Sequence, residues 1–81
     1  MERASLKSDL VTIIRLIAEG DKAIARHREL VEVLEGDPET SSDNLQRARD
    51  VLTSMEEMQT RRITNRDTIR RLAGDDRIDR E

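Results

Sequence analysis

Apolar residues recur along the first part of the chain at alternating spacings of four and three. The series is Leu6, Leu10, Ile13, Ile17, Gly20, Ile24, His27, Val31 and Leu34. This spacing is the inward stripe of a heptad repeat and predicts a helix over residues 4–35. Leu16, Ala23 and Leu30 add a third position to each heptad. The apolar face is therefore wider than a two-stranded seam needs, which is typical of a helix with two neighbours.

Turn-forming residues end this first helix. Gly36 can take the left-handed conformation that closes a helix, and Pro38 cannot continue one. The stretch from Gly36 to Ser42 holds the only cluster of turn formers in the chain. We therefore expect a turn over residues 36–42.

A second helix is expected over residues 43–73. Its N-cap is Ser41 or Ser42, because a serine hydroxyl can accept a hydrogen bond from a free amide of the first turn. The alternative start has Asp37 as the cap and Pro38 as the first helical residue. We favour the later start.

The stripe of the second helix is apolar only towards its ends. It consists of Leu45, Ala48, Leu52 and Met55, widened by Val51 and Met58, and is restored by Ile69 and Leu72. Between them the heptad gives inward positions to Gln59, Arg62 and Arg66. The internal methionines are expected to fill gaps in the core. We expect Gly74 to close the helix and residues 75–81 to form a charged flexible tail.

Two long helices joined by so short a turn must lie antiparallel, so the predicted fold is an all-α two-helix hairpin over residues 1–74. Pairing Leu34 with Leu45 places residues whose numbers add up to 79 opposite each other. The turn half of this hairpin is apolar on both helices, whereas the open half sets isoleucines against arginines. Gly20 falls opposite Gln59, where it either makes room for the facing side chains or is a kink or neutral site.

A lone hairpin is expected to leave five N-terminal apolar residues largely exposed, namely Leu10, Ile13, Ile14, Leu16 and Ile17. Covering them takes a second copy, and two hairpins then form a two-fold four-helix bundle. The predicted dimer interface lies on the first helix and consists of Leu10, Ile13, Ile14, Leu16, Ile17, Gly20 and Ile24.

The composition narrows the chemistry that the chain can perform. Its 81 residues include no Cys, Phe, Tyr or Trp, and 41% of them are charged. A disulfide scaffold, a cysteine-based zinc site, a thiol nucleophile and an aromatic base-stacking platform are thereby excluded. We expect no enzyme activity, catalytic residue, metal site or cofactor. No apolar run is long enough to span a membrane, so we expect no membrane partner and a cytoplasmic location.

Charge is unevenly distributed, with a net charge of −5 over residues 23–58 and +4 over residues 59–74. The basic stretch contains a candidate anion or nucleic-acid ridge, made of Arg61, Arg62, Arg66, Arg70 and Arg71. Arginines at one-turn spacing can follow a phosphate backbone. They can equally form a solvated face with ion pairs such as Glu57–Arg61 and Asp67–Arg71. The leading interpretation is a small interaction protein that binds itself and an unidentified protein; a nucleic-acid-associated regulator is the alternative.

His27 is the only histidine of the chain. The run His27-Arg28-Glu29-Leu30 has a faint likeness to the phospho-accepting His-Glu-Leu-Arg-Thr-Pro box of sensor kinase dimerisation domains. An arginine intervenes, no proline follows nearby, and the heptad turns His27 towards the seam. We therefore expect a partly buried boundary histidine and keep phosphotransfer as a third hypothesis.

Several short motifs resemble those of a group of short uncharacterised bacterial helical-hairpin proteins with an Ile-Ala-Glu-Gly motif. The corresponding pieces here are Ile17-Ala18-Glu19-Gly20, Ile24-Ala25, Leu34-Glu35, Met55-Glu56-Glu57 and Arg66-Asp67-Thr68-Ile69-Arg70-Arg71-Leu72. The resemblance covers residues 13–74. It implies a bacterial origin and a helical hairpin, and it supplies no catalytic residues.

Overall fold

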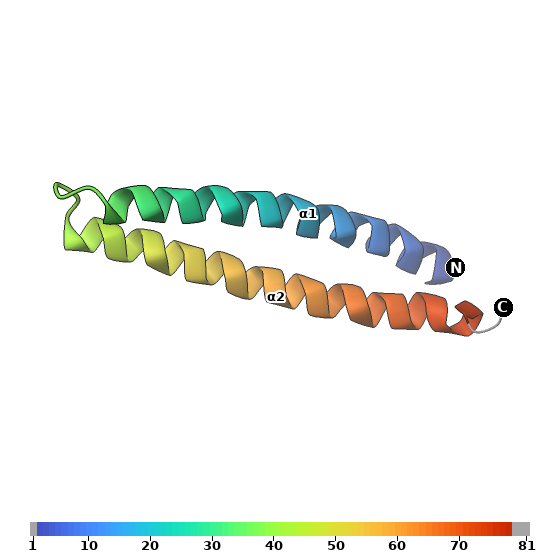
Figure 1. The fold of residues 1–81 in the computed structure, drawn as a ribbon. Coiled ribbons are helices and arrows are strands. Elements are labelled where there is room, and N and C mark those ends of the chain that lie inside the picture. The colour runs from blue at the N-terminus through green and yellow to red at the C-terminus, as the bar shows by residue number, and fades with distance from the viewer. Residues whose placement is uncertain (1, 79–81) are drawn as a thin grey trace.

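The computed structural model describes the backbone of residues 2–78 and the side chains of residues 5–73. It consists of two helices, α1 (Glu2–Glu35) and α2 (Ser42–Ile78). They pack side by side and antiparallel, so that the start of α1 and the end of α2 lie at the same end of a long hairpin (Figure 1). The hairpin measures 59 × 18 × 15 Å. The predicted all-α hairpin is confirmed, and the described part of the chain contains no strand.

The last turn of α1 tightens before the chain leaves the helix. The amide of Gly36 donates to the carbonyls of Glu32 (3.1 Å) and Val33 (3.2 Å), and the amide of Asp37 donates to Leu34 (3.2 Å). Bonds that reach back only three residues are a common way to satisfy terminal carbonyls. The expected left-handed Gly36 is wrong, because no glycine in the described residues has a positive φ.

A tight turn follows, built on Asp37 and Pro38. The carbonyl of Asp37 accepts from the amide of Thr40 (3.1 Å), and its carboxylate Oδ1 accepts from the amide of Glu39 (2.9 Å). Proline suits the second position of such a turn because its φ is already fixed. Asp37 thus caps this turn and does not begin α2.

Ser41 is the N-cap of α2. Its Oγ accepts a hydrogen bond from the amide of Asn44 at 3.1 Å, and its carbonyl accepts the first helical bond from Leu45 at 3.0 Å. Of the two predicted starts, the later one is therefore the correct one. Asp43 lies in the first turn, where the helix dipole favours negative charge.

The seam between the helices follows the predicted stripes. Among the side chains that the structure describes, the buried ones are those of Ile17, Ile24, Val31, Ala48, Gln59 and Ala73. All of them stand on the alternating four-and-three series of their helix. Gly20 contacts Gln59, and Ile24 lines a groove together with Met55, so the predicted register holds at both places.

The C-terminal part of α2 departs from the prediction. The helix continues through Gly74 to Ile78, so residues 75–78 are helical, and residues 79–81 lie outside the described residues. Leu72 is 62% exposed and Ala73 is buried, because the alternating series steps four residues from Ile69. Met58 is likewise exposed and does not fill the core.

Candidate interaction surface

A polar residue interrupts the seam near its middle. Gln59 is only 5% exposed. Its Nε2 donates to the carbonyl of Ile17 at 2.7 Å and to Oδ1 of Asp21 at 2.8 Å. Its Oε1 is buried and has no hydrogen-bond partner among the described residues. Both amide protons of Gln59 are therefore used to hold α2 against α1.

Gly20 provides the space that Gln59 occupies. A Cβ atom at Gly20 would overlap with Oε1 of Gln59 and would lie 3.0 Å from Nη1 of Arg62. Of the two roles expected for Gly20, making room for the facing side chains is confirmed. We call Gly20, Asp21, Gln59 and Arg62 the polar layer. It favours one register, because any slip would bury the Gln59 amide without acceptors.

One flank of the seam is closed by ion pairs. Arg28 Nη2 lies 2.9 Å from Oε2 of Glu56, and Arg49 Nη2 lies 2.8 Å from Oε2 of Glu35. With Asp21, these four residues form what we call the ionic flank. The sequence prediction missed both pairs. The signal was present, because each helix carries one arginine and one glutamate seven residues apart beside its apolar stripe.

The other flank of the seam is apolar. Leu16, Ala23 and Leu30 lie seven residues apart and share one side of α1, and Val51 and Met58 share one side of α2 in the same way. Ala23 and Met58 line the same groove, so the two rows meet. We call these five residues the apolar flank.

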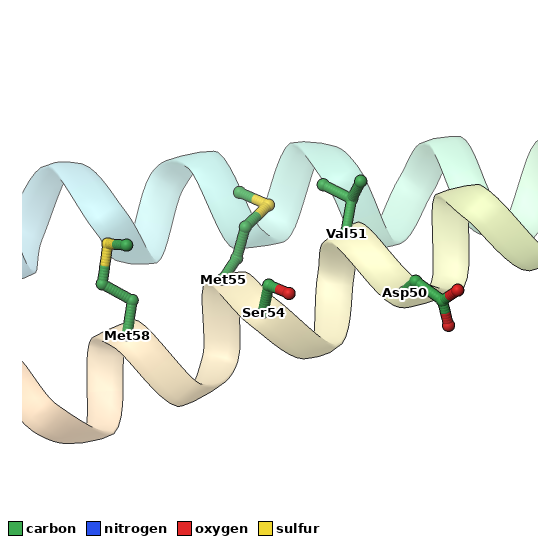
Figure 2. Close-up of a pocket in the computed structure, with 5 residues that line it drawn as sticks. All are labelled: Asp50, Val51, Ser54, Met55 and Met58. Atoms are coloured by element: carbon green, nitrogen blue, oxygen red, sulfur yellow. The ribbon is translucent and has the colours of Figure 1, made fainter.

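Two shallow grooves open on the apolar flank. One, of about 230 Å³, is lined by Gly20, Ala23, Ile24, Met55, Met58 and Arg62. The other, of about 270 Å³, lies on α2, where Val51, Met55 and Met58 rise on the side of α1 (Figure 2). Both volumes fall below the range of about 300–1,000 Å³ that is usual for small-molecule pockets.

Exposed hydrophobic side chains are more numerous on this flank than on the ionic flank. The large ones that are exposed among the described residues are Val11, Ile14, Leu16, Leu30, Val33, Val51, Met58, Ile63 and Leu72. Leu16, Leu30, Val51 and Met58 belong to the apolar flank, and Leu72 continues its row on α2. Ile14 and Ile63 instead continue the rows of the ionic flank towards the open end.

The residues of the predicted dimer interface do not lie on one surface of the hairpin. Ile17 and Ile24 are buried within the hairpin, and Gly20 belongs to the polar layer. The expectation that a lone hairpin leaves Ile17 largely exposed is wrong, because Ile17 is only 8% exposed. Leu10 and Ile13 are half-buried. Ile14 and Leu16 remain exposed, and they lie on opposite flanks.

The five predicted ridge arginines do not form one uniform surface. Arg62 and Arg66 are half-buried at the seam, whereas Arg61, Arg70 and Arg71 are exposed. The reason is that each four-residue step turns a helix by about 40° beyond a full turn, so a ridge at this spacing winds away from the seam. Among the described side chains neither Glu57–Arg61 nor Asp67–Arg71 forms an ion pair; Asp67 pairs with Arg66 at 3.0 Å.

His27 is a half-buried residue of the seam, as predicted. Its Nε2 lies 2.9 Å from the carbonyl oxygen of Ala48, so this ring nitrogen carries a proton and donates it. That hydrogen bond occupies the nitrogen that faces α2. Phosphotransfer by His27 stays a prediction.

Over the described residues no group of three or more His, Cys, Asp or Glu side chains is placed to hold a metal ion. In the same part of the chain neither helix has an apolar stretch long enough to cross a membrane. Comparisons of the chain with protein-family models, with curated proteins and with solved structures give no match. The resemblance to short bacterial hairpin proteins therefore stays a prediction.

Proposed function

We propose that this protein is a non-catalytic helical interaction module that self-associates, two hairpins forming a four-helix bundle. The proposal is supported by the unequal flanks of the seam. Ion pairs close one flank, whereas the other presents Leu30, Val51 and Met58 to solvent. Contiguous apolar patches on small proteins commonly mark interaction sites.

The shape of the molecule supports binding over catalysis. The grooves are shallow and open, and their linings are apolar apart from Arg62, Asp50 and Ser54. A catalytic site needs acid, base or nucleophilic groups that converge on one reacting atom. The cytoplasmic location expected from the sequence is part of the proposal and stays a prediction.

Sedimentation equilibrium of the full chain over a wide concentration range tests self-association. We expect the mass to rise from one towards two copies of the 9.3 kDa chain as concentration increases. A folded, helical monomer throughout the range contradicts the proposal. A mass well above two copies contradicts the four-helix bundle but not self-association.

The alternative function is nucleic-acid association through the basic stretch. The exposure of Arg61, Arg70 and Arg71 favours it. It predicts retention of labelled DNA or RNA that weakens steeply with salt, because bound phosphates release counterions. The variant with all three arginines changed to Glu should abolish retention. Retention that survives this variant contradicts the alternative.

A further inference from the structure

We infer that the second copy docks on the apolar flank, formed by Leu16, Ala23, Leu30, Val51 and Met58, and not on the side of Ile14. This inference rests on the proposed self-association and specifies its surface. It gives α2 a direct share of the interface, whereas the sequence analysis placed most of the interface on the first helix.

Ile14 and Leu16 lie on nearly opposite sides of α1. Two residues apart on a helix are about 160° apart around its axis. With the seam fixed by Ile17 and Ile24, one of the pair falls on each flank. A neighbouring hairpin packed along one flank covers only that flank, so a single two-fold contact cannot bury both Ile14 and Leu16.

The ionic flank is the poorer docking surface. Arg28, Glu35, Arg49 and Glu56 already have partners across the seam, and burying them would cost the hydration of their exposed charged groups. On the apolar flank the central positions are Ala23 and Met58. A small residue beside a flexible thioether forms a groove that an incoming apolar side chain can fill.

The available area agrees with a second copy as the occupant. One long face of a hairpin of 59 × 18 × 15 Å offers roughly the 800 Å² per partner that a stable interface buries. The row Leu16, Ala23 and Leu30 covers about 21 Å of this length, at 1.5 Å per residue. A second hairpin laid along the face would therefore bury an apolar centre with a polar rim, as interfaces commonly do.

Charge at the border of the apolar flank also fits a second copy. Glu19, Arg26 and Arg61 are exposed and lie three residues after Leu16, Ala23 and Met58. If the turns of the two copies lie at the same end, Glu19 of one copy falls level with Arg61 of the other. If the turns lie at opposite ends and the two-fold axis passes Ala23, Glu19 faces Arg26. Either arrangement pairs opposite charges.

Two equally exposed residues of α1 provide a matched test. Leu30 on the apolar flank and Ile14 on the ionic flank are both 44% exposed. We expect Leu30→Glu to weaken self-association by roughly thirtyfold or more, because it would place a charge inside the interface, and Ile14→Glu to leave it nearly unchanged. Met58→Glu and Ile63→Glu form the corresponding pair on α2. Sedimentation equilibrium measures all four, and circular dichroism checks that each remains helical.

Thiol protection tests the same surface without a disruptive charge. The chain has no cysteine, so Leu30→Cys and Ile14→Cys each introduce a single thiol. With rising protein concentration the reaction of a thiol reagent should slow at residue 30 and not at residue 14. If the thiol at residue 14 is protected instead, or if Ile14→Glu is the variant that dissociates, the inference about the surface is wrong although self-association is supported. A wild-type chain that remains monomeric contradicts the proposed function itself.

Discussion

At the scale of single residues, the contact between Gly20 and Gln59 is the most specific feature of the hairpin. Glycine inside a helix normally costs about 1 kcal/mol relative to alanine. Here the missing Cβ makes room for Oε1 of Gln59, while its Nε2 is held by Ile17 and Asp21. An ordinarily unfavourable residue is therefore compatible with a well-packed seam.

Gly20→Ala should destabilise the hairpin by about 1 kcal/mol. The gain in helix propensity is outweighed because Gln59 must move and lose hydrogen bonds worth about 1–3 kcal/mol when buried. In a Gln59→Ala background the same substitution should stabilise by about 1 kcal/mol, since only the flexible end of Arg62 then lies close to the new Cβ. Urea unfolding of the wild-type chain, the two single variants and the double variant measures this double-mutant cycle. Equal effects of Gly20→Ala in both backgrounds would show that the two residues are not coupled.

At the scale of elements, the end of α1 and the start of α2 are stabilised by different hydrogen bonds. α1 ends in a tightened turn without a left-handed glycine, and α2 begins with the Ser41 cap. The cap supplies an acceptor for the amide of Asn44, which would otherwise lack a helical partner. Because the cap lies at the turn, it also fixes where α2 meets α1.

Ser41→Ala should lower the free energy of unfolding by about 1 kcal/mol, the usual cost of a lost N-cap. Ser42→Ala is the matched control, because Ser42 is exposed and is the first residue inside α2. It should change stability by less than about 0.5 kcal/mol. Thermal or urea unfolding followed by circular dichroism measures both. A larger loss of stability for Ser42→Ala than for Ser41→Ala would indicate that Ser42, and not Ser41, is the N-cap.

At the scale of the whole molecule, folding and association are expected to be linked. Over residues 5–73 the buried core of one hairpin is small, consisting of Ile17, Ile24, Val31, Ala48 and Ala73 besides Gln59. Further apolar surface lies on the apolar flank, where only a partner can cover it. Anything that binds the folded form alone raises its stability.

The melting temperature should therefore rise with protein concentration, by about 4 °C for each tenfold increase if the dimer is the unfolding unit. The double variant Leu30→Glu, Met58→Glu should melt at a lower temperature that does not depend on concentration. Circular dichroism at several concentrations measures both. A concentration-independent melting temperature for the wild-type chain, with the variant unchanged, would indicate that folding is complete within one hairpin.

The sequence by itself determined the two helices, their antiparallel pairing, the register near Gly20 and a serine cap for α2, which it left open between Ser41 and Ser42. These follow from local chemistry, because a heptad period, a proline and a serine act through neighbours a few residues away. It misplaced the end of α2, since glycine permits a helix to stop but does not require it.

Only the tertiary structure decided which apolar residues the seam covers. Ile17 is buried by α2, and Ile14 and Leu16 are parted onto two flanks with different neighbours. It also decided that Asp21 would accept a hydrogen bond from the side-chain amide of Gln59. The physical reason is that burial and hydrogen bonding across a seam depend on how each helix is rotated about its own axis. A periodic pattern in the sequence does not fix that rotation to better than one residue position on either side of the stripe.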